Sequence, residues 1–147
     1  MPPLIREFLP SDLDAAYRLD QLCFEPGIAY TKSEIRAFVA RPGTVALVAE
    51  SGGEMAGFGI AHRSGSEGHV VTLDVSAADR CRGTGRLLLT ETLERLRLQG
   101  AREVRLEVDV RNAGAIRFYE KMGFRRTRVL KSYYGAGRDG LEMTREL

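Results

Sequence analysis

Two β-strand patterns, separated by an arginine- and glycine-rich loop and a helix, constrain the fold of this chain most strongly. Residues 69–76 and 102–110 alternate between two faces, and the second segment alternates strictly between apolar and charged side chains. Between them the stretch RCRGTGRLLL, residues 80–89, leads into a helix that Gly100 ends. A strand–helix–strand crossover of this kind predicts a sheet with a helix packed on one face.

The remaining segments add hairpins and further helices. Strands are expected at 4–8, 44–50, 54–62, 124–134 and 141–147, and helices at 11–24, 31–40 and 112–123. Ser11 with Asp14, and Thr31 with Glu34, have capping-box spacing at the first two helix starts. Strand 69–76 is expected to place Val71, Leu73 and Val75 on one face and Val70, Thr72 and Asp74 on the other. This order predicts one domain over residues 1–147, with a mixed α/β sheet of about seven strands flanked by four helices.

Charge, hydropathy and cysteine content exclude several classes of protein. The net charge of +2 and the pI near 8.7 are only mildly basic, and acids are interleaved with bases, so we expect no nucleic-acid partner. No apolar run reaches membrane-spanning length, and the opening MPPLIREFLP lacks the pattern of a secretory signal, so we expect a cytoplasmic location. Cys23, Cys81, His62 and His69 have no metal-ligand spacing, so we expect no metal site and interpret both histidines as surface or strand residues.

The loop at residues 80–86 combines three arginines with two glycines just before a helix. Backbone N–H groups at a helix N-terminus lack partners within the helix, and the helix dipole adds partial positive charge there. Glycine lets this backbone approach a ligand closely, so the loop suits a pyrophosphate. The glycine spacing matches neither the dinucleotide fingerprint nor a Walker loop. Taken alone, it favours an ordinary connecting loop over a phosphate cradle.

Two motifs in sequence carry a family resemblance. Arg-x-x-Gly-x-Gly, between a strand and a leucine-rich helix, resembles the acetyl-coenzyme A signature of the GNAT-type N-acetyltransferases. The segment LEVDVRNAGAIRFYEKMGF, residues 106–124, resembles the second hallmark of that superfamily. With the later Tyr-Tyr pair, it is most similar to the ribosomal-protein-alanine (RimI-type) N-terminal acetyltransferases. The resemblance implies the GNAT fold and direct transfer of acetyl from acetyl-CoA to a primary amine in a ternary complex.

The resemblance also assigns contacts to the cofactor. It implies that strand 69–76 separates from its neighbour, that pantetheine lies in the gap, and that a backbone N–H of this strand stabilises the oxyanion. The residues assigned to the cofactor are Leu73, Asp74, Val75, Arg80, Cys81, Arg82, Gly83, Thr84, Gly85, Arg86, Asn112 and Tyr119. Cys81 is expected to contribute its backbone and no nucleophile, and Asn112 is alternatively no more than a helix N-cap.

Two side chains are candidates for acid–base catalysis. Glu107 occupies the position of the RimI-type base and would deprotonate the amine through a water molecule. Alternatively, it is an exposed strand carboxylate balanced by Arg105. Tyr119 is the candidate acid for the departing thiolate, because the reference pKa values of a phenol and a thiol are close enough for proton donation. Alternatively, it is a core residue packed beside Phe118 and Met122.

The acceptor side is assigned to the connection between the first two helices and to the strand ending at the tyrosine pair. The resemblance implies that Phe24, Ile28 and Tyr30 line a pocket for the first side chain of a peptide, and that Tyr133 and Tyr134 hold its backbone. A protein or peptide N-terminus is therefore the expected acceptor. This loop departs from the RimI-type loop, which is shorter and carries a tryptophan, whereas this chain has no Trp. Core packing is the alternative for Phe24 or Ile28.

Two other functions compete with this prediction. Acetylation of a small amine, such as a polyamine, an amino acid or an aminoglycoside-type drug, would require several acids around the pocket. The obvious supply is Glu25, Glu34, Glu107 and Asp109. A non-catalytic acyl-CoA-binding regulatory module would keep the cradle without turnover, but the presence of both Glu107 and Tyr119 argues against it. The sequence leaves monomer and homodimer open.

Overall fold

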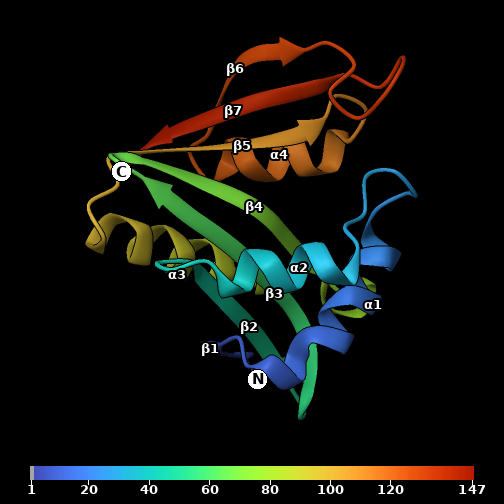
Figure 1. Cartoon of the computed structure of the whole chain (residues 1–147), viewed down its shortest axis with the longest axis vertical. Helices are drawn as coiled ribbons and strands as arrows, with labels where there is room; N and C mark the ends of the chain where they lie inside the picture. Colours follow the sequence, from blue (N-terminus) through green and yellow to red (C-terminus); the bar gives the residue numbers. More distant parts are fainter. Residues whose placement is uncertain (1) are drawn as a thin grey trace.

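The computed structural model describes residues 2–147, so Met1 of the predicted domain lies outside the described residues. The described residues form one mixed sheet of seven strands in the order β1-β2-β3-β4-β5-β7-β6, together with four α-helices (Figure 1). This architecture confirms the predicted mixed α/β fold and the predicted order of elements along the chain.

The strands divide the sheet into two halves. They are β1 (Leu4–Glu7), β2 (Val45–Ser51), β3 (Glu54–Ser64), β4 (Glu67–Val75), β5 (Glu103–Asp109), β6 (Arg125–Leu130) and β7 (Gly140–Glu146). Strands β1 to β4 pair with one another as antiparallel neighbours, and β7 lies antiparallel between β5 and β6. The parallel pair β4–β5 joins the two halves.

The four helices cover the two faces of the sheet unequally. They are α1 (Leu13–Cys23), α2 (Lys32–Ala40), α3 (Thr84–Leu98) and α4 (Ala113–Lys121). Helices α1 and α2 pack on one face of β2–β4 around Phe58 and Ile60, whereas α3 and α4 lie on the other face against Val104 and Leu106 (Figure 1). Strands β5, β7 and β6 therefore have helices on one face only, and this leaves the Glu107 side of β5 free to line a site.

The predicted faces of β5 are confirmed, but those of β4 are wrong in one respect. Val104, Leu106 and Val108 of β5 are buried in the core beneath α3 and α4. In β4, Ile60 pairs with Thr72 and Ala61 with Val70, so Val71 is the extra residue of a β-bulge. Consequently Val71 packs in the α1–α2 cluster while Leu73 packs in the α3–α4 cluster, and the two no longer share a face.

Two predicted boundaries also change. Helix α1 begins at Leu13 after a 3-10 turn at Pro10–Asp12, so Ser11 is not its cap; instead the Asp12 carboxylate accepts the Leu9 N–H at 2.7 Å and binds Arg6. The Thr31–Glu34 capping box of α2 is confirmed. Strand β6 ends at Leu130, where the chain turns and Ser132 adopts a φ of 53°, so Tyr133 and Tyr134 lie in the loop beyond the strand.

Two expectations about membranes and metals concern the whole chain. No helix in residues 2–147 is long and apolar enough to cross a bilayer. The same residues contain no group of three or more His, Cys, Asp or Glu side chains arranged to hold a metal ion.

Candidate active site

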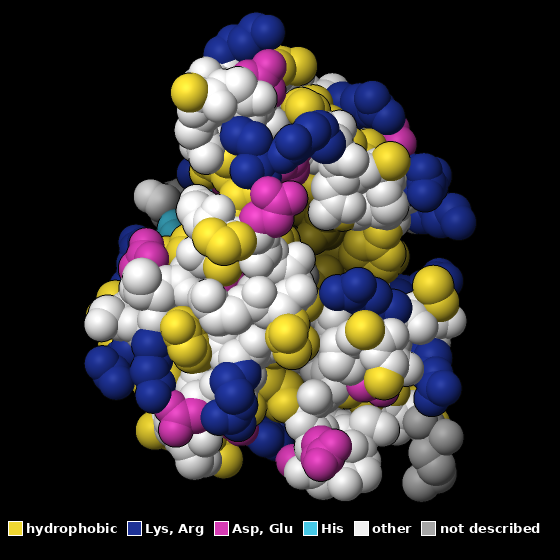
Figure 2. Space-filling model, turned by 90° about the vertical axis from the view of Figure 1, so that its right-hand side faces the viewer, with side chains coloured by type: hydrophobic (Ala, Val, Ile, Leu, Met, Phe, Trp, Pro, Cys, Tyr) yellow, Lys and Arg dark blue, Asp and Glu magenta, His cyan; other side chains and the backbone are white. Residues whose placement is uncertain are grey.

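A cleft opens where β4 and β5 separate. The two strands pair only at Glu67–Glu103, Gly68–Val104 and His69–Arg105, although β4 continues to Val75 and β5 to Asp109. The cleft between the separated ends has a volume of about 1260 Å³. Figure 2 shows the molecule from this side, hollowed between its two halves, with hydrophobic side chains in the hollow and Lys or Arg side chains around it. The predicted separation of these strands is therefore present.

Alternate backbone groups of β4 face the cleft and not β3. The carbonyl of Val71 accepts a bond from the Tyr30 hydroxyl, and the carbonyl of Val75 accepts one from the Arg80 Nε at 3.2 Å. The Ser76 N–H, in contrast, donates to Ala56 of β3. Because N–H and C=O directions alternate along a strand, the N–H groups of Leu73 and Val75 point into the cleft.

Asp74 is the exception among the three β4 residues assigned to the cofactor. It pairs with Phe58 of β3, and its side chain is buried under α1, where only 1% of the residue is exposed. Leu73 and Val75 line the cleft, whereas Asp74 does not. Side-chain alternation along β4 is the reason, because it places Asp74 on the face opposite Leu73 and Val75.

The arginine-glycine loop forms the other end of the cleft. Gly83 is the N-cap of α3 with a φ of 84°, which favours glycine, and no side chain caps this helix. The first-turn N–H groups of α3 therefore have no intrahelical acceptor. A β-carbon at Gly85 would lie 3.4 Å from the Phe118 ring, so the loop and α4 approach closely here. The start of α3 therefore presents free backbone N–H groups, and their role as a phosphate cradle stays a prediction.

The side chains of the loop are distributed unevenly around the cleft. Those residues that line it are Arg80, Cys81, Gly83, Gly85 and Arg86, and two further cations, Arg111 and Lys121, lie at the same cleft. Within the described residues, Arg82 and Thr84 do not line it, and Thr84 is buried. Arg80 folds back onto the Val75 carbonyl and the Cys23 sulfur, so it braces the loop against β4.

Tyr119 and Asn112 both reach the cleft from α4. The Tyr119 ring packs edge-on against Phe118 and Phe124, so the core-packing alternative holds for the ring, and the residue also lines the cleft. Burial, followed by the nearby charge of Asp74, raises the pKa of the Tyr119 phenol. The side chain of Asn112 accepts the Ala115 N–H at 3.1 Å, so Asn112 is the N-cap of α4 and a cleft residue at once.

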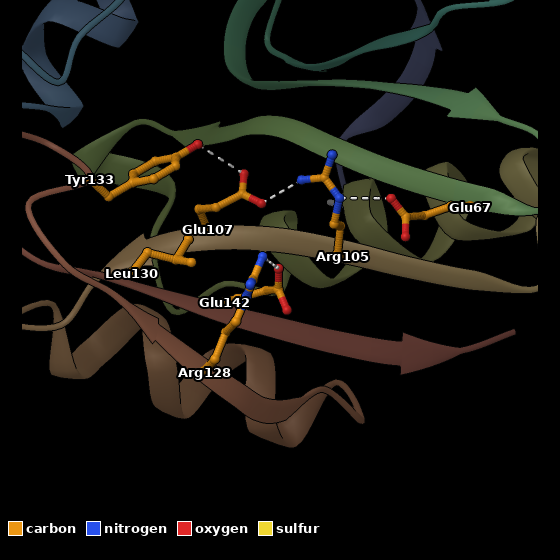
Figure 3. A pocket seen from close by; sticks show the side chains of 7 residues that line it. All are labelled: Glu67, Arg105, Glu107, Arg128, Leu130, Tyr133 and Glu142. Carbon is orange, nitrogen blue, oxygen red and sulfur yellow. Dashed lines mark hydrogen bonds and ion pairs between the residues drawn. The ribbon is translucent and has the colours of Figure 1, made fainter.

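Glu107 lies at the centre of a polar cluster on β5. Its Oε1 lies 2.6 Å from His69 Nε2. Figure 3 shows its other two contacts, in which Oε1 lies 3.3 Å from the Tyr133 hydroxyl and Oε2 lies 2.6 Å from an Arg105 nitrogen. Arg105 also binds Glu67 at 2.8 Å. Glu67, Arg105 and Tyr133 border a second hollow of about 470 Å³ that extends over β6 and β7, and Glu107 lines both this hollow and the cleft. The alternative interpretation, in which Arg105 balances the charge of Glu107, is therefore partly correct, because this ion pair exists inside the candidate site.

The cluster keeps Glu107 ionised. Burial raises the pKa of this carboxyl, but hydrogen bonds and charge from His69 and Arg105 outweigh burial, so that its pKa is lowered overall. An ionised carboxylate only accepts, so the short contact indicates a proton on His69 Nε2. Sequence analysis missed His69, which it interpreted as an ordinary strand residue. His69 pairs with Arg105 across β4 and β5, and this pairing brings it next to Glu107. The sequence alone does not specify the register of these two strands, so the contact could not be predicted from it.

All five residues assigned to the acceptor line the cleft, namely Phe24, Ile28, Tyr30, Tyr133 and Tyr134. Phe24 and Ile28 belong to neither core cluster, so core packing does not explain them. The Tyr133 and Tyr134 rings meet edge-on at 4.8 Å between centroids. Burial raises the pKa of the Tyr30 and Tyr134 phenols, so both are hydrogen-bond donors at neutral pH. This end of the cleft is aromatic with polar edges.

An ion-pair bridge that sequence analysis missed crosses the same end. A terminal nitrogen of Arg138, in the β6–β7 loop, lies 3.0 Å from Glu25 in the α1–α2 loop and 3.2 Å from Asp109 at the end of β5. Asp109 also binds Arg111. The bridge connects the two loops that carry the acceptor residues, and it leaves each nearby acid paired with a cation.

Comparison with known proteins decides the family. Residues 13–124 match the family described as Acetyltransferase (GNAT) family. The chain belongs to this family. It is an acetyl-CoA-dependent N-acetyltransferase, and the RimI-type resemblance is supported by its relatives.

Three similar proteins show which members of the GNAT family this chain resembles. It is 32% identical over 145 residues to an N-acetyltransferase of Methanocaldococcus jannaschii, covering 97% of this chain and 91% of that one. It is 31% identical over 126 residues to the ribosomal protein bS18-alanine N-acetyltransferase of Escherichia coli, covering 84% and 82%. The crystal structure of Ard1 from Thermoplasma volcanium superposes with a TM-score of 0.92 at 31% identity, covering 100% and 99%.

Proposed function

We propose that this N-acetyltransferase acetylates the free α-amine of a protein or peptide N-terminus, by direct attack within a ternary complex. The observation that carries the proposal is the acceptor end of the cleft, where an aromatic pocket lies beside the ionised Glu107 and its His69 partner. The name of the bS18-alanine relative, which specifies a protein alanine, supports the same acceptor class. We further propose that residues 1–147 act as one catalytic domain.

The cleft has groups that fit acetyl-CoA along its length. The free N–H groups at the start of α3 suit the pyrophosphate, and Arg86 adds charge there. The N–H groups of Leu73 and Val75 would bind the pantetheine in the gap that β5 leaves open. The first-turn amides and the open edge of β4 are unpaired in the sheet and helix, so a ligand is their natural partner. The side chains of Arg82, Thr84 and Asp74 have no part in this arrangement.

Glu107 and His69 would accept the proton of the incoming ammonium. A water molecule held by Glu107 carries the proton away, because the carboxylate oxygens are already bound by His69 and Arg105. The lowered pKa of Glu107 keeps it ionised, so the carboxylate with its His69 partner can draw the proton through this water. The neutral amine nitrogen then attacks the thioester carbon.

Groups on β4 and α4 would stabilise the oxyanion and the departing thiolate. Negative charge that develops on the carbonyl oxygen would be stabilised by an N–H of Leu73 or Val75, a fixed donor that needs little reorganisation. When the carbon–sulfur bond breaks, its electron pair goes to sulfur, and Tyr119 would donate a hydrogen bond to the thiolate. The raised pKa of Tyr119 keeps the phenol protonated, which favours hydrogen-bond donation over complete proton transfer.

Charge at the acceptor end argues against a polycationic acceptor. Glu25 and Asp109 bind Arg138, and Glu107 binds Arg105, so these three cleft acids are paired internally. The fourth candidate, Glu34, caps α2 and does not line the cleft. A peptide N-terminus brings one positive charge and needs one accepting group. The paired tyrosines add a hydroxyl at Glu107 and aromatic surface for a backbone.

Mass spectrometry of acceptor panels tests the proposal. The enzyme is incubated with acetyl-CoA and peptides that carry one α-amine and one lysine, beside matched peptides with a blocked α-amine and beside spermidine, free amino acids and kanamycin. We expect one acetyl group on the free α-amine and none on the blocked peptides. Acetylation confined to small amines would replace the peptide acceptor with the alternative class. Thermal stabilisation by acetyl-CoA without acetylation of any amine would favour a binding module.

A further inference from the structure

Two carboxyl groups that the chemistry above does not use lie buried between α1 and β4. Asp20 of α1 is 0% exposed and Asp74 of β4 is 1% exposed. Asp20 Oδ2 accepts the Tyr30 N–H at 2.7 Å, and Asp74 Oδ1 accepts the Thr72 hydroxyl at 2.5 Å. One oxygen of each carboxyl therefore accepts a hydrogen bond from a residue close to it in sequence.

The other oxygen of each carboxyl is the unusual feature. Asp20 Oδ1 and Asp74 Oδ2 are both buried without a protein hydrogen-bond donor, while the two side chains lie within hydrogen-bonding reach of each other. Two ionised carboxylates in contact between α1 and β4 would repel strongly, and neither could donate a hydrogen bond to the other. A single proton between them satisfies both oxygens and removes one of the two charges.

The structure assigns one shared proton to Asp20 and Asp74, and we propose that this carboxylic acid–carboxylate bond positions the acceptor loop against the cofactor strand. Asp20 holds the backbone of Tyr30, an acceptor-pocket residue, and Asp74 lies between Leu73 and Val75, whose N–H groups face the cleft. The inference rests on the proposed function for the roles of these two elements. Asp20 and Asp74 are positioning residues, because neither lines the cleft.

The surroundings of the pair favour retention of the proton. Burial first, and then the neighbouring Asp20, raise the pKa of Asp74, while the Thr72 hydrogen bond and the charge of Arg80 act in the opposite direction. Cys23 of α1 and Tyr119 of α4 also lie within the influence of the Asp74 charge. When the proton leaves at high pH, two buried negative charges face each other, and α1 with its loop is pushed away from β4.

Asp74→Asn tests the inference through pH dependence. The amide supplies a permanent N–H where the shared proton lay, so the bond to Asp20 no longer depends on pH. We expect the kcat/KM of the wild type for a peptide acceptor to fall by about tenfold per pH unit above the pKa of the pair, as for loss of one proton. We call this fall of kcat/KM at high pH the alkaline limb. In Asp74→Asn the limb is absent, and kcat/KM changes by less than about twofold over the same pH range. Asp12→Asn, which alters a mostly buried carboxylate bound to Arg6 outside the cleft, retains the limb.

Stability against pH provides a readout that needs no activity. Because the folded-state pKa of Asp74 lies above its unfolded value, the proton stabilises the fold fully below about pH 4, and this stabilisation is lost as pH rises through the folded-state pKa. The unfolding equilibrium constant therefore rises by up to about tenfold per pH unit in that window, and Asp74→Asn removes this slope. If Asp74→Asn does not fold, Asp20→Asn makes the same exchange from the other side.

The outcomes separate this inference from the proposed function. Loss of both the limb and the slope in Asp74→Asn, but not in Asp12→Asn, supports it. Loss of the slope with an unchanged limb would overturn the positioning role, and an unchanged slope would overturn the shared proton itself. If no peptide is acetylated, the proposed function fails and the positioning role falls with it, while the slope still decides whether the proton is shared.

Discussion

The two walls of the cleft hold buried carboxyl groups under opposite conditions. On β5, Glu107 lies against His69 and Arg105, which lower its pKa more than burial raises it. On β4, Asp74 lies against Asp20, and burial with this neighbour raises its pKa. The chemical group is the same and both are largely removed from water, so the partner decides the charge. One wall can therefore hold an ionised base while the other holds a proton.

The contrast extends to pH dependence. Glu107 has a folded-state pKa below its unfolded value, so its stabilising contribution is present above about pH 4 and is lost as pH falls through the lowered pKa. Asp74 behaves in the opposite way, as its contribution is lost when pH rises. The cleft is expected to keep an ionised Glu107 and a protonated Asp74 together only at pH values between the folded-state pKa of Glu107 and that of Asp74.

Removing the charge from the β5 wall is expected to have the largest effect. Glu107→Gln keeps the shape but can no longer accept the ammonium proton through water, and the bonds to His69 and Arg105 weaken. We expect kcat/KM for the peptide acceptor to fall by about 10²- to 10³-fold, in the range of acid–base catalysis, with little change in acetyl-CoA binding. Steady-state kinetics measure this. Glu142→Gln, on the neighbouring strand outside the cleft, is the matched control, and an equal loss there would remove Glu107 from the role of base.

Removing the phenol hydroxyl of Tyr119, on α4, is expected to rank second. Tyr119→Phe preserves the packing with Phe118 and Phe124 but removes the donor to the thiolate. We expect kcat to fall by about 10- to 100-fold, while the affinity for acetyl-CoA changes less than about threefold. Turnover rates and calorimetric binding are compared with those of Tyr17→Phe, which alters a tyrosine of the α1–α2 core. An unchanged rate would show that the ring acts only in packing.

The glycine at the start of α3 is expected to have an intermediate effect confined to the cofactor. Gly83→Ala forces a β-carbon onto a φ of 84°, so the loop shifts and its amides lose their alignment. We expect acetyl-CoA to bind about tenfold more weakly, equivalent to about 1.4 kcal/mol. Gly100→Ala, at the other end of α3 with a φ of 106°, carries a similar conformational strain away from the cleft. Equal weakening in both variants would attribute the effect to stability and not to the amides.

The bridge between the acceptor loops is expected to have the smallest effect. Arg138→Gln releases Glu25, whose side chain is largely exposed, and such ion pairs contribute only about 0–1 kcal/mol. We expect KM for the peptide to rise about threefold with kcat and acetyl-CoA affinity retained. Arg128→Gln, which releases Glu142 outside the cleft, is the control. A change in kcat alone would contradict a role of the bridge in holding the acceptor.

Sequence patterns predicted those parts of the site that depend on local order. The strict alternation of β5 placed Glu107 on its polar face, and the glycines before α3 marked the free amides, because both signals lie within one element or turn. Asp74 was assigned to the cofactor through the family resemblance, together with its neighbours Leu73 and Val75, although the alternation of β4 places its side chain on the opposite face. The bulge at Val71 leaves no mark in the apolar pattern of Val70 and Val71, so the separation of Val71 from the face of Leu73 was not predictable.

The remaining features required contacts between distant segments. His69 meets Glu107 only through the register of β4 with β5, and Arg138 meets Glu25 only because two loops fold toward each other. The family resemblance implied the separation of β4 and β5, which no residue pattern in either strand indicated. A charged side chain can find several partners in a mixed sheet, and its sequence neighbours do not specify which one.

Carbon NMR of selectively labelled carboxyl groups during a pH titration tests the contrast between the walls most directly. The account predicts that the Glu107 signal titrates at lower pH than an ordinary glutamate, whereas the Asp74 signal remains that of a protonated group well above the ordinary aspartate range. Titration of both signals within their ordinary ranges would contradict it.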